Sequence, residues 1–241
     1  TPWTGRLRAR DHEAVARALR RAGGEALAHR PLAEMSDGER QRMAIARALA
    51  QEPGVLVLDE PTAFLDLPSR LEFLDLLRRL AHNEGLAVLV TTHDLDAALA
   101  CADRVWLLAN GALRQGLPEE LALDGSLARA FAAAGVAFDL ERGSFRPRRA
   151  LRASLHLDGD PLGVAWTRRA LERLGLHATL GDRAAASDLP ATGLQLRVER
   201  RPNDAEGTLC WWWSDGSASE EMISLAAVVE RLEGRLEAPR R

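Results

Sequence analysis

Lysine is absent from this 241-residue sequence, so all 32 of its basic side chains are arginine. The absence excludes a phosphate-binding loop of the form GxxxxGK[ST], because that loop needs a lysine to reach the β- and γ-phosphates of a nucleotide. Cysteine is scarce as well: Cys101 and Cys210 lie far apart and fit no metal-ligand spacing. We expect both to be buried free thiols in a reducing compartment.

The sequence also lacks a basic excess and a long apolar run. Its net charge of −3 gives no electrostatic signature of nucleic-acid binding, so we expect no nucleic-acid partner. Apolar stretches such as Leu86–Val90 are far shorter than the roughly 20 residues that span a bilayer. Nothing resembles a secretory signal, and a cytosolic location is expected.

The first 120 residues alternate between helical and strand patterns. Two apolar runs, Val55–Leu58 and Leu86–Thr91, predict strands buried on both faces of a parallel sheet. A hairpin is predicted around Asn110-Gly111. Helices are predicted over residues 11–29 (ending near Gly23-Gly24), from the residue after Glu39 to Gln51, and over Arg70–His82, Asp96–Cys101 and 119–135. This alternation predicts an α/β fold, a parallel sheet flanked by helices.

The pattern changes after Gly143–Arg149, which reads as a linker with Pro147 and three arginines. Leu151–Leu157 and Leu194–Val198 alternate apolar and polar residues, as strands with one solvated face do. We expect a separate α+β unit over residues 150–241, of order βαβββα, that regulates or recognises rather than catalyses. Its domain neighbour would span residues 1–142.

Two helices are predicted in this C-terminal part. Asp160 is a candidate N-cap with Pro161 at the first helical position of Pro161–Arg173. Ser217 and Glu220 suggest a capping box ahead of a helix over Ser219–Leu232, ending near Gly234. Apolar stripes on both helices are expected to cover one face of the sheet: Leu162, Trp166, Ala170 and Leu174 on the first; Ile223, Ala226, Ala227 and Glu230, flanked by Val229, on the second.

The run Trp211-Trp212-Trp213 ends the last predicted strand. It could mark a ligand-stacking site, but alternate residues of a strand lie on opposite faces. We therefore expect Trp211 and Trp213 to cover the core of the sheet, with Trp212 facing outward or toward the neighbouring domain.

Three short segments of the first half carry candidate chemistry. Taken alone, Ser36 and Glu39 form a capping box before an apolar helix. Asp59-Glu60 ends a predicted strand, where ligands bind in α/β folds. His93 ends the next strand and, alone, reads equally as a turn histidine.

In this order the segments resemble known motifs. Ser36-Asp37-Gly38-Glu39-Arg40-Gln41, Leu56–Thr62, Phe64-Leu65-Asp66 and Thr92-His93-Asp94 resemble the signature motif, Walker B motif, D-loop and H-loop of ABC transporter ATPases. The resemblance covers about residues 1–120. It implies the C-terminal part of an ABC-type P-loop ATPase, a helical subdomain plus a parallel-sheet core, followed here by the small α+β domain.

The resemblance implies a role for each motif residue. Asp59 would hold Mg²⁺ and Glu60 would polarise the water that attacks the γ-phosphate of ATP. His93 would clamp the γ-phosphate and that water.

The remaining motif residues would act across a pair of ATPase subunits, here a homodimer. Ser36, the backbone of Gly38 and Glu39 would face the partner's nucleotide at a helix N-terminus. Asp66 would bridge the two subunits.

The sequence departs from the family pattern in three ways. Asp37 stands where a second glycine is usual, and Glu39 where a glutamine is usual. A carboxylate near phosphate is unfavourable, so Asp37 must point away or the site is weakened. The phosphate-binding loop and Q-loop are missing, and Thr1 is no translation start. We therefore expect a truncated sequence that hydrolyses no ATP by itself.

Short segments at Thr1–Gly5 and Phe64–Pro68 resemble the ATPases of iron–siderophore, haem or cobalamin importers. That implies transmembrane permease partners and a peripheral position on the cytoplasmic face of the cell membrane. One alternative is a degenerate, non-hydrolysing regulatory subunit with a C-terminal sensor domain, against which Glu60 and His93 argue. Another is an ABC ATPase of DNA repair or chromosome structure, but the chain shows neither heptads nor a CxxC pair.

Overall fold

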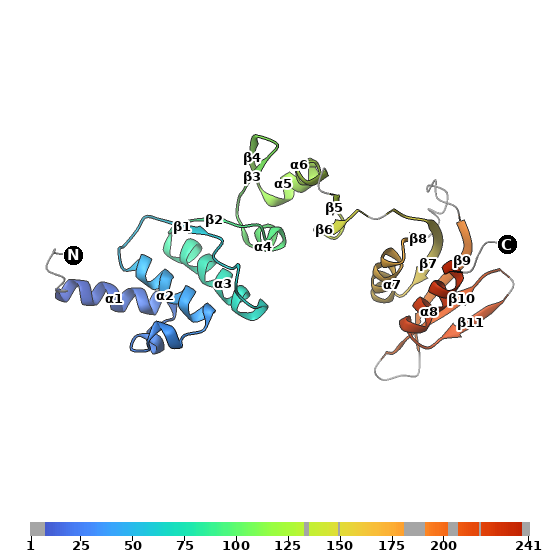
Figure 1. The fold of residues 1–241 in the computed structure, drawn as a ribbon, viewed down its shortest axis with the longest axis horizontal. Coiled ribbons are helices and arrows are strands. Elements are labelled where there is room, and N and C mark those ends of the chain that lie inside the picture. Colours follow the sequence, from blue (N-terminus) through green and yellow to red (C-terminus); the bar gives the residue numbers. More distant parts are fainter. Residues whose placement is uncertain are drawn as a thin grey trace. The chain divides into compact units, whose positions relative to one another are not determined.

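The computed structural model describes residues 8–132, 135–148, 150–180, 191–201, 207–216 and 218–237. The chain divides into an N-terminal unit, Thr1–Arg146, and a C-terminal unit, Pro147–Arg241 (Figure 1). Among the described residues, no helix is both long enough and apolar enough to cross a membrane.

The N-terminal unit begins with helices around a small parallel sheet. The helix predicted over residues 11–29 ends at Ala22, because Gly23 takes a left-handed φ of 63° and caps it. The elements in chain order are α1 Ala9–Ala22, two short 3₁₀ turns at Glu25–Leu27 and Leu32–Glu34, α2 Asp37–Leu49, β1 Val55–Asp59, α3 Leu67–Glu84, β2 Ala87–Thr91 and α4 Leu95–Cys101.

Strands β1 and β2 pair in parallel, as the apolar runs predict, with Leu56 opposite Val88. Leu56 belongs to a core that α1, α2 and α3 supply, including Ile45 and Leu80. The prediction that both faces are buried is wrong. Val57 is 63% exposed, because side chains alternate along a strand and no described element covers the face opposite the helices.

A second, smaller cluster completes the N-terminal unit. The hairpin is confirmed: Asn110 and Gly111 have φ values of 52° and 74°, the left-handed angles of a tight hairpin turn. Its elements are β3 Val105–Ala109, β4 Ala112–Gly116, α5 Pro118–Leu123, α6 Ser126–Phe131, β5 Val136–Asp139 and β6 Ser144–Pro147.

The linker predicted over Gly143–Arg149 is partly wrong, because Ser144–Pro147 forms β6 and pairs with β5. The physical reason is Phe145. Its ring lies 4.8 Å from that of Phe131 and 4.9 Å from that of Phe138, which draws this segment into the small apolar cluster.

The C-terminal unit is a five-stranded mixed sheet of order β11-β10-β9-β7-β8 with two helices. Strand β7 pairs in parallel with β8 and β9, while β10 runs antiparallel to β9 and β11. The elements are β7 Ala153–Gly159, α7 Pro161–Arg173, β8 Leu176–Leu180, β9 Ala191–Arg200, β10 Leu209–Ser214, β11 Ser219–Met222 and α8 Leu225–Glu237. The order is thus βαββββα, one strand more than predicted.

The unpredicted strand is β11. The predicted capping box fails here: Ser217 lies outside the described residues, and Glu220 lies in β11 opposite Trp213. Met222, at the end of β11, is buried in the core, which favours a strand over a helix start. Helix α8 begins three residues later, where the Ser224 hydroxyl accepts a hydrogen bond from the Ala227 amide at 3.2 Å.

The core of this unit lies between one face of the sheet and the two helices. Leu157 and Leu196 of the sheet and Val228 and Leu232 of α8 are almost fully buried there. Cys210 is a buried free thiol as predicted, whereas Cys101 of the N-terminal unit is only half-buried.

The predicted face of helix α7 is half right, because Ala170 is buried and Leu174 packs against the core. Asp160 caps the helix as expected, accepting from the Gly163 amide at 2.9 Å. Leu162 and Trp166 are each 54% exposed, while Gly163 and Thr167 face the sheet. A Cβ on Gly163 would lie 2.4 Å from Cγ1 of Val198, so only glycine allows this close helix–sheet approach.

Helix α8 also presents a shifted face. Val228 and Leu232 are buried, whereas Ile223 precedes the helix and is 75% exposed. Of the predicted stripe, Ala227 packs against the core.

The tryptophan run behaves as predicted. Trp211 and Trp213 are 7% and 3% exposed on the core face, and Trp212 is 37% exposed on the opposite face. The buried Trp211 donates its indole N–H to the Thr167 hydroxyl at 2.7 Å, which satisfies a polar atom that burial would otherwise penalise.

Candidate active site

Three predicted site residues lie at one edge of the small parallel sheet, and two of them, Glu60 and His93, are in contact. Asp59 ends β1, Glu60 follows it, and His93 lies just past β2. Because Asp59 stands opposite Thr91 in the parallel register, both chains leave the sheet at the same edge. The result is a direct contact of 2.8 Å between Nδ1 of His93 and Oε2 of Glu60.

The backbone of Glu60 is held in an uncommon conformation. Its φ is 45°, a left-handed angle that few residues other than glycine adopt. The Glu60 amide donates to the carbonyl oxygen of Thr91 at 3.0 Å, so the end of β2 holds the turn. Backbone strain of this kind is concentrated at functional sites, where it aims a side chain.

Asp59 is tied to the neighbouring strand by a different bond, because the Thr91 hydroxyl donates to its Oδ1. The carboxylates of Asp59 and Glu60 are hard oxygen donors of the kind that Mg²⁺ prefers. Within the described ranges, no group of three or more histidine, cysteine or acidic side chains could hold a metal. Proteins usually bind Mg²⁺ through one or two carboxylates together with substrate oxygens, and the carboxylates of Asp59 and Glu60 fit that form of binding.

A cavity of about 250 Å³ lies at this edge of the sheet. Its walls come from the segment after β1, from the first turn of α3 and from the loop after β2. The residues are Glu60, Thr62, Ala63, Arg70, Thr92, His93 and Asp94.

Sequence reasoning missed the role of Arg70 in this cavity. Its Nη1 contacts Oδ2 of Asp94 at 2.7 Å, and its Nη2 donates to the Leu65 carbonyl at 3.3 Å. Asp94 also caps α4 by accepting from the Ala97 amide at 3.0 Å. Arg70 thereby fixes the loop that carries His93. The pair is separated by 24 residues, and no local spacing signals such a contact.

Ser36, Gly38 and Glu39 lie at the start of α2 and do not line this cavity. They form the capping box that the sequence predicts: the Ser36 amide donates to the Glu39 carboxylate at 2.8 Å, and the Glu39 amide donates to the Ser36 hydroxyl at 3.2 Å. The hydrogen bond from the Ser36 backbone, helped by the nearby Arg30, lowers the pKa of Glu39.

The two unusual acids of this segment are engaged in contacts within the unit. Asp37 pairs with Nη1 of Arg40 at 2.9 Å, one turn along the helix. Glu39 pairs with Nη1 of Arg30 at 3.0 Å besides its capping bond. Each of the two carboxylates therefore has an arginine neighbour.

Asp66 lies beside this segment. It caps α3, accepting from the Ser69 amide at 2.9 Å, and the hydrogen bonds from Ser69, side chain first and backbone second, lower its pKa. A Cβ on Gly38 would lie 3.2 Å from both Cβ and Oγ of Ser69. The starts of α2 and α3 thus pack against each other, and the small size of Gly38 permits it.

Comparison with known proteins finds relatives of this part of the chain. Residues 4–63 match the ABC transporter family. An uncharacterised ABC transporter ATP-binding protein of Methanocaldococcus jannaschii is 48% identical over 124 residues, 50% of this chain and 43% of that protein.

Two further relatives are named for import. The petrobactin import ATP-binding protein of Bacillus anthracis is 39% identical over 60% of this chain and 53% of its own length. The hemin import ATP-binding protein of Streptomyces coelicolor is 46% identical over 54% of this chain and 47% of its own. The chain therefore spans about half the length of the curated relatives it matches.

One solved structure, a protein assigned to the metal-chelate type of ABC transporter in an inward-facing conformation, matches with a TM-score of 0.50. It is 31% identical over 53% of this chain and 51% of its own. The motifs, their geometry at the sheet edge and these relatives agree: residues 4–63 match the ABC transporter family, and about half of the chain is similar to ABC transporter ATP-binding proteins.

Proposed function

We propose that this chain is part of an ATP-hydrolysing subunit that energises an ABC importer of an iron–siderophore or a related metal chelate. The observation that carries the proposal is the contact between Glu60 and His93 at the carboxyl edge of β1 and β2. The names of the petrobactin and hemin import relatives support the class of cargo.

In the proposed reaction, each residue at the edge has one task. The Glu60 carboxylate accepts a hydrogen bond from the attacking water and aims it. His93, held by Glu60 at 2.8 Å, positions that water and contacts the transferred phosphoryl group. The side chain of Asp59 would hold Mg²⁺, which neutralises charge that develops on the phosphate oxygens.

The residues at the helix starts belong to the second half of a composite site. We infer that Ser36, Gly38 and Glu39 face the nucleotide of a second ATPase subunit, and that Asp66 contacts that subunit. Their separation from the Glu60–His93 cavity within one chain supports a shared site. The further partners in this proposal are the transmembrane permease subunits, with the ATPase bound peripherally at the cytoplasmic face of the membrane.

If the chain were instead part of a non-hydrolysing regulatory subunit, we would expect catalytic residues at this edge of the sheet to be missing or misplaced. The Glu60–His93 contact and the neutralising partners of Asp37 and Glu39 favour the hydrolysing subunit instead. We assign the C-terminal unit a regulatory or recognition role, because none of the candidate active-site residues belongs to it.

The test uses the complete subunit, phosphate-binding loop included, assembled with its permease. Glu60→Gln should reduce ATP turnover at least about a hundredfold while ATP binding persists, since the phosphate contacts are untouched. Glu13→Gln, at an exposed position of α1, is the matched control and should turn over normally. Near-normal turnover by the Glu60→Gln subunit would refute the assignment, and the 241-residue chain alone should release no phosphate above that variant.

A further inference from the structure

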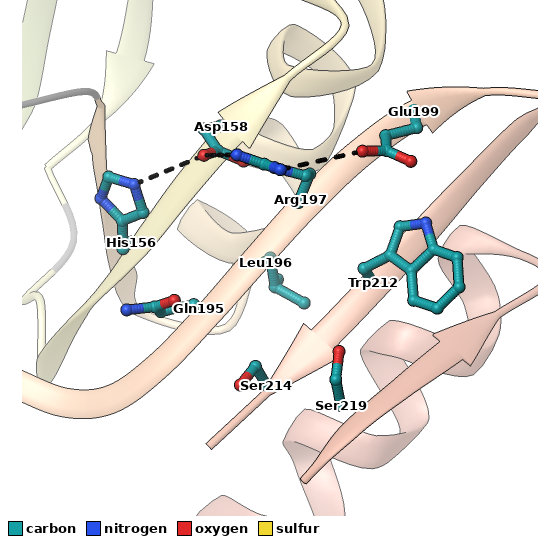
Figure 2. A pocket seen from close by; sticks show the side chains of 9 residues that line it. All are labelled: His156, Asp158, Gln195, Leu196, Arg197, Glu199, Trp212, Ser214 and Ser219. Carbon is teal, nitrogen blue, oxygen red and sulfur yellow. Dashed lines mark hydrogen bonds and ion pairs between the residues drawn. The ribbon is translucent and has the colours of Figure 1, made fainter. Parts of the chain in front are cut away.

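The open face of the C-terminal sheet carries a hollow of about 370 Å³, larger than the one at the candidate active site. Figure 2 shows side chains from β7, β9, β10 and β11 around it. Most are polar, as expected for the solvated face of a sheet. A small ligand fits this volume, since small-molecule sites measure roughly 300–1,000 Å³.

Trp212 borders the hollow with a free ring. Trp166 has the guanidinium of Arg169 at 4.6 Å from its centroid, and Trp213 has that of Arg235 at 5.9 Å. Within the described part of the chain, no arginine lies over Trp212, although it is 37% exposed. An aromatic face attracts cations through its quadrupole, and this one is still available.

The charged groups around the hollow favour a positive ligand. Arg197, directly across the strand pair from Trp212, is its single guanidinium and is already engaged. Its Nε and Nη2 contact the two oxygens of Asp158 at 3.0 and 3.2 Å, and its Nη1 lies 3.9 Å from Oε1 of Glu199. The hydrogen bond to Asp158 raises the pKa of Arg197, which stays protonated.

Two carboxylates against one guanidinium leave the hollow with a net charge of −1 when His156 is neutral. Glu199 can accept further hydrogen bonds, because among the described residues its carboxylate contacts only Arg197, at the long distance of 3.9 Å. Figure 2 shows Glu199 and Trp212 on the same side of the hollow, Arg197 lying toward Asp158. An anion placed there would face an uncompensated carboxylate, whereas a cation would find both that carboxylate and an aromatic face.

We propose that this hollow binds a small alkylammonium cation, with its charge between the Trp212 ring and the Glu199 carboxylate. The hydroxyls of Ser214 and Ser219 and the amide of Gln195 line the rest of the hollow and offer hydrogen bonds to polar groups on the same ligand. A metal ion is a poorer fit, because no group of three ligating side chains exists among the described residues. All residues that line this hollow belong to the C-terminal unit, and the proposal does not depend on the proposed ATPase function.

The test is a titration of the whole chain with choline and two isosteres of it, neutral 3,3-dimethylbutan-1-ol and anionic 3,3-dimethylbutanoate. The readout is the indole N–H resonance of Trp212, assigned by its loss in Trp212→Phe. Choline should shift this resonance with a Kd on the order of 1 mM, while the isosteres leave it in place. The resonance of Trp166, whose face Arg169 occupies, is the internal control and should not move.

Two variants separate binding from folding. Glu199→Gln should weaken choline binding about three- to tenfold, while Glu233→Gln, an exposed acid of α8, should leave it unchanged. Circular dichroism should show the same fold for both. The proposal is overturned if choline leaves Trp212 unmoved at about ten times that concentration, if the neutral alcohol shifts it equally, or if both glutamine variants weaken binding alike.

Discussion

The two sheets of this molecule treat their uncovered faces in opposite ways. In the N-terminal unit, Val55 and Val57 of β1 are 58% and 63% exposed, and Leu89 of β2 is 39% exposed. In the C-terminal unit, the uncovered face carries residues such as Gln195 and Arg197, while Leu196 between them is buried. Aliphatic residues thus lie on both faces of the N-terminal sheet, whereas the uncovered face of the C-terminal sheet carries mostly polar residues beside Trp212.

The difference shows that the composition of a strand indicates how many faces of its sheet are suited to being covered. A continuously apolar strand is suited to a sheet covered on both sides, and an alternating strand to a sheet covered on one. Helices α7 and α8 cover one face of the C-terminal sheet, as the alternating pattern of its strands predicts. The described part of the N-terminal unit covers one face of β1 and β2 and leaves apolar surface on the other.

The comparison predicts that replacing an apolar strand residue by alanine costs much more unfolding free energy in the C-terminal sheet than in the N-terminal sheet. Leu157→Ala in β7 removes a fully buried side chain and should cost about 2–5 kcal/mol of unfolding free energy. Val57→Ala in β1 removes an exposed one and should cost less than about 1 kcal/mol. Urea unfolding followed by tryptophan fluorescence measures the first, and hydrogen exchange of the β1 amides measures the second. Equal losses would mean that the face of β1 is covered in solution.

A second prediction concerns what holds the site loop of the N-terminal unit, since apolar burial at that edge is slight. Arg70→Met should destabilise the unit by about 1–3 kcal/mol, because it strips Asp94 of a half-buried charged partner. Hydrogen exchange over residues 92–98 should quicken, and the Arg70→Met/Asp94→Asn double mutant should lose less than the sum of the single changes. Strict additivity would show that the ion pair does not hold the loop. Arg79→Met, at an exposed pair with Asp75, is the matched control and should change little.

Local chemistry made much of the fold predictable. The capping box at Ser36 and Glu39, the cap at Asp160 and the Asn110-Gly111 turn depend on neighbours within a few residues, and all three form. The alternation of Trp211, Trp212 and Trp213 follows from strand geometry alone. These features can be predicted without knowing which elements pack against them.

The failures depend on contacts distant in sequence. Pairing with β10 and the burial of Met222 make β11 a strand, despite a local pattern typical of a helix start. The face of α7 follows from the close approach of Gly163 to Val198, 35 positions along the chain, rather than from the largest apolar side chains. At the site, motif order predicted that Glu60 and His93 act together. The left-handed turn at Glu60 and the Arg70–Asp94 pair could not be predicted, because both depend on contacts between segments distant in sequence.

A third prediction uses the exposed apolar face itself. Replacing Val55 and Val57 by threonine keeps β-branched side chains but makes the surface more polar, so stability should change by no more than about 1 kcal/mol. Binding of the dye 8-anilinonaphthalene-1-sulfonate and self-association in sedimentation velocity should both fall. The matched double change in the C-terminal sheet, Gln195→Thr with Arg197→Thr, should not reduce either signal. A fall of the same size there would remove the contrast between the sheets.

The smallest expected effects concern one feature that the two units share, an aspartate that caps a helix. Asp66 caps α3 through Ser69, and Asp160 caps α7 through the Gly163 amide and also pairs with Arg200. The pKa of each carboxyl is lowered, chiefly by the Ser69 side-chain hydrogen bond for Asp66 and by the Gly163 backbone hydrogen bond for Asp160.

A carboxyl whose pKa is lower in the folded state stabilises the fold above its ordinary pKa of 3.8, and that contribution disappears as pH falls through the folded-state value. Asp66→Ala and Asp160→Ala should each lower the melting temperature of their own unit by a few degrees at neutral pH. The difference from the parent chain should shrink once the pH falls below that ordinary value. Asp160→Ala should have the larger effect, because Arg200 loses its partner too. Thermal unfolding of the parent and both variants, at neutral pH and in acid, checks this order, and a deficit that persists unchanged in acid would show that the caps do not act through their charge.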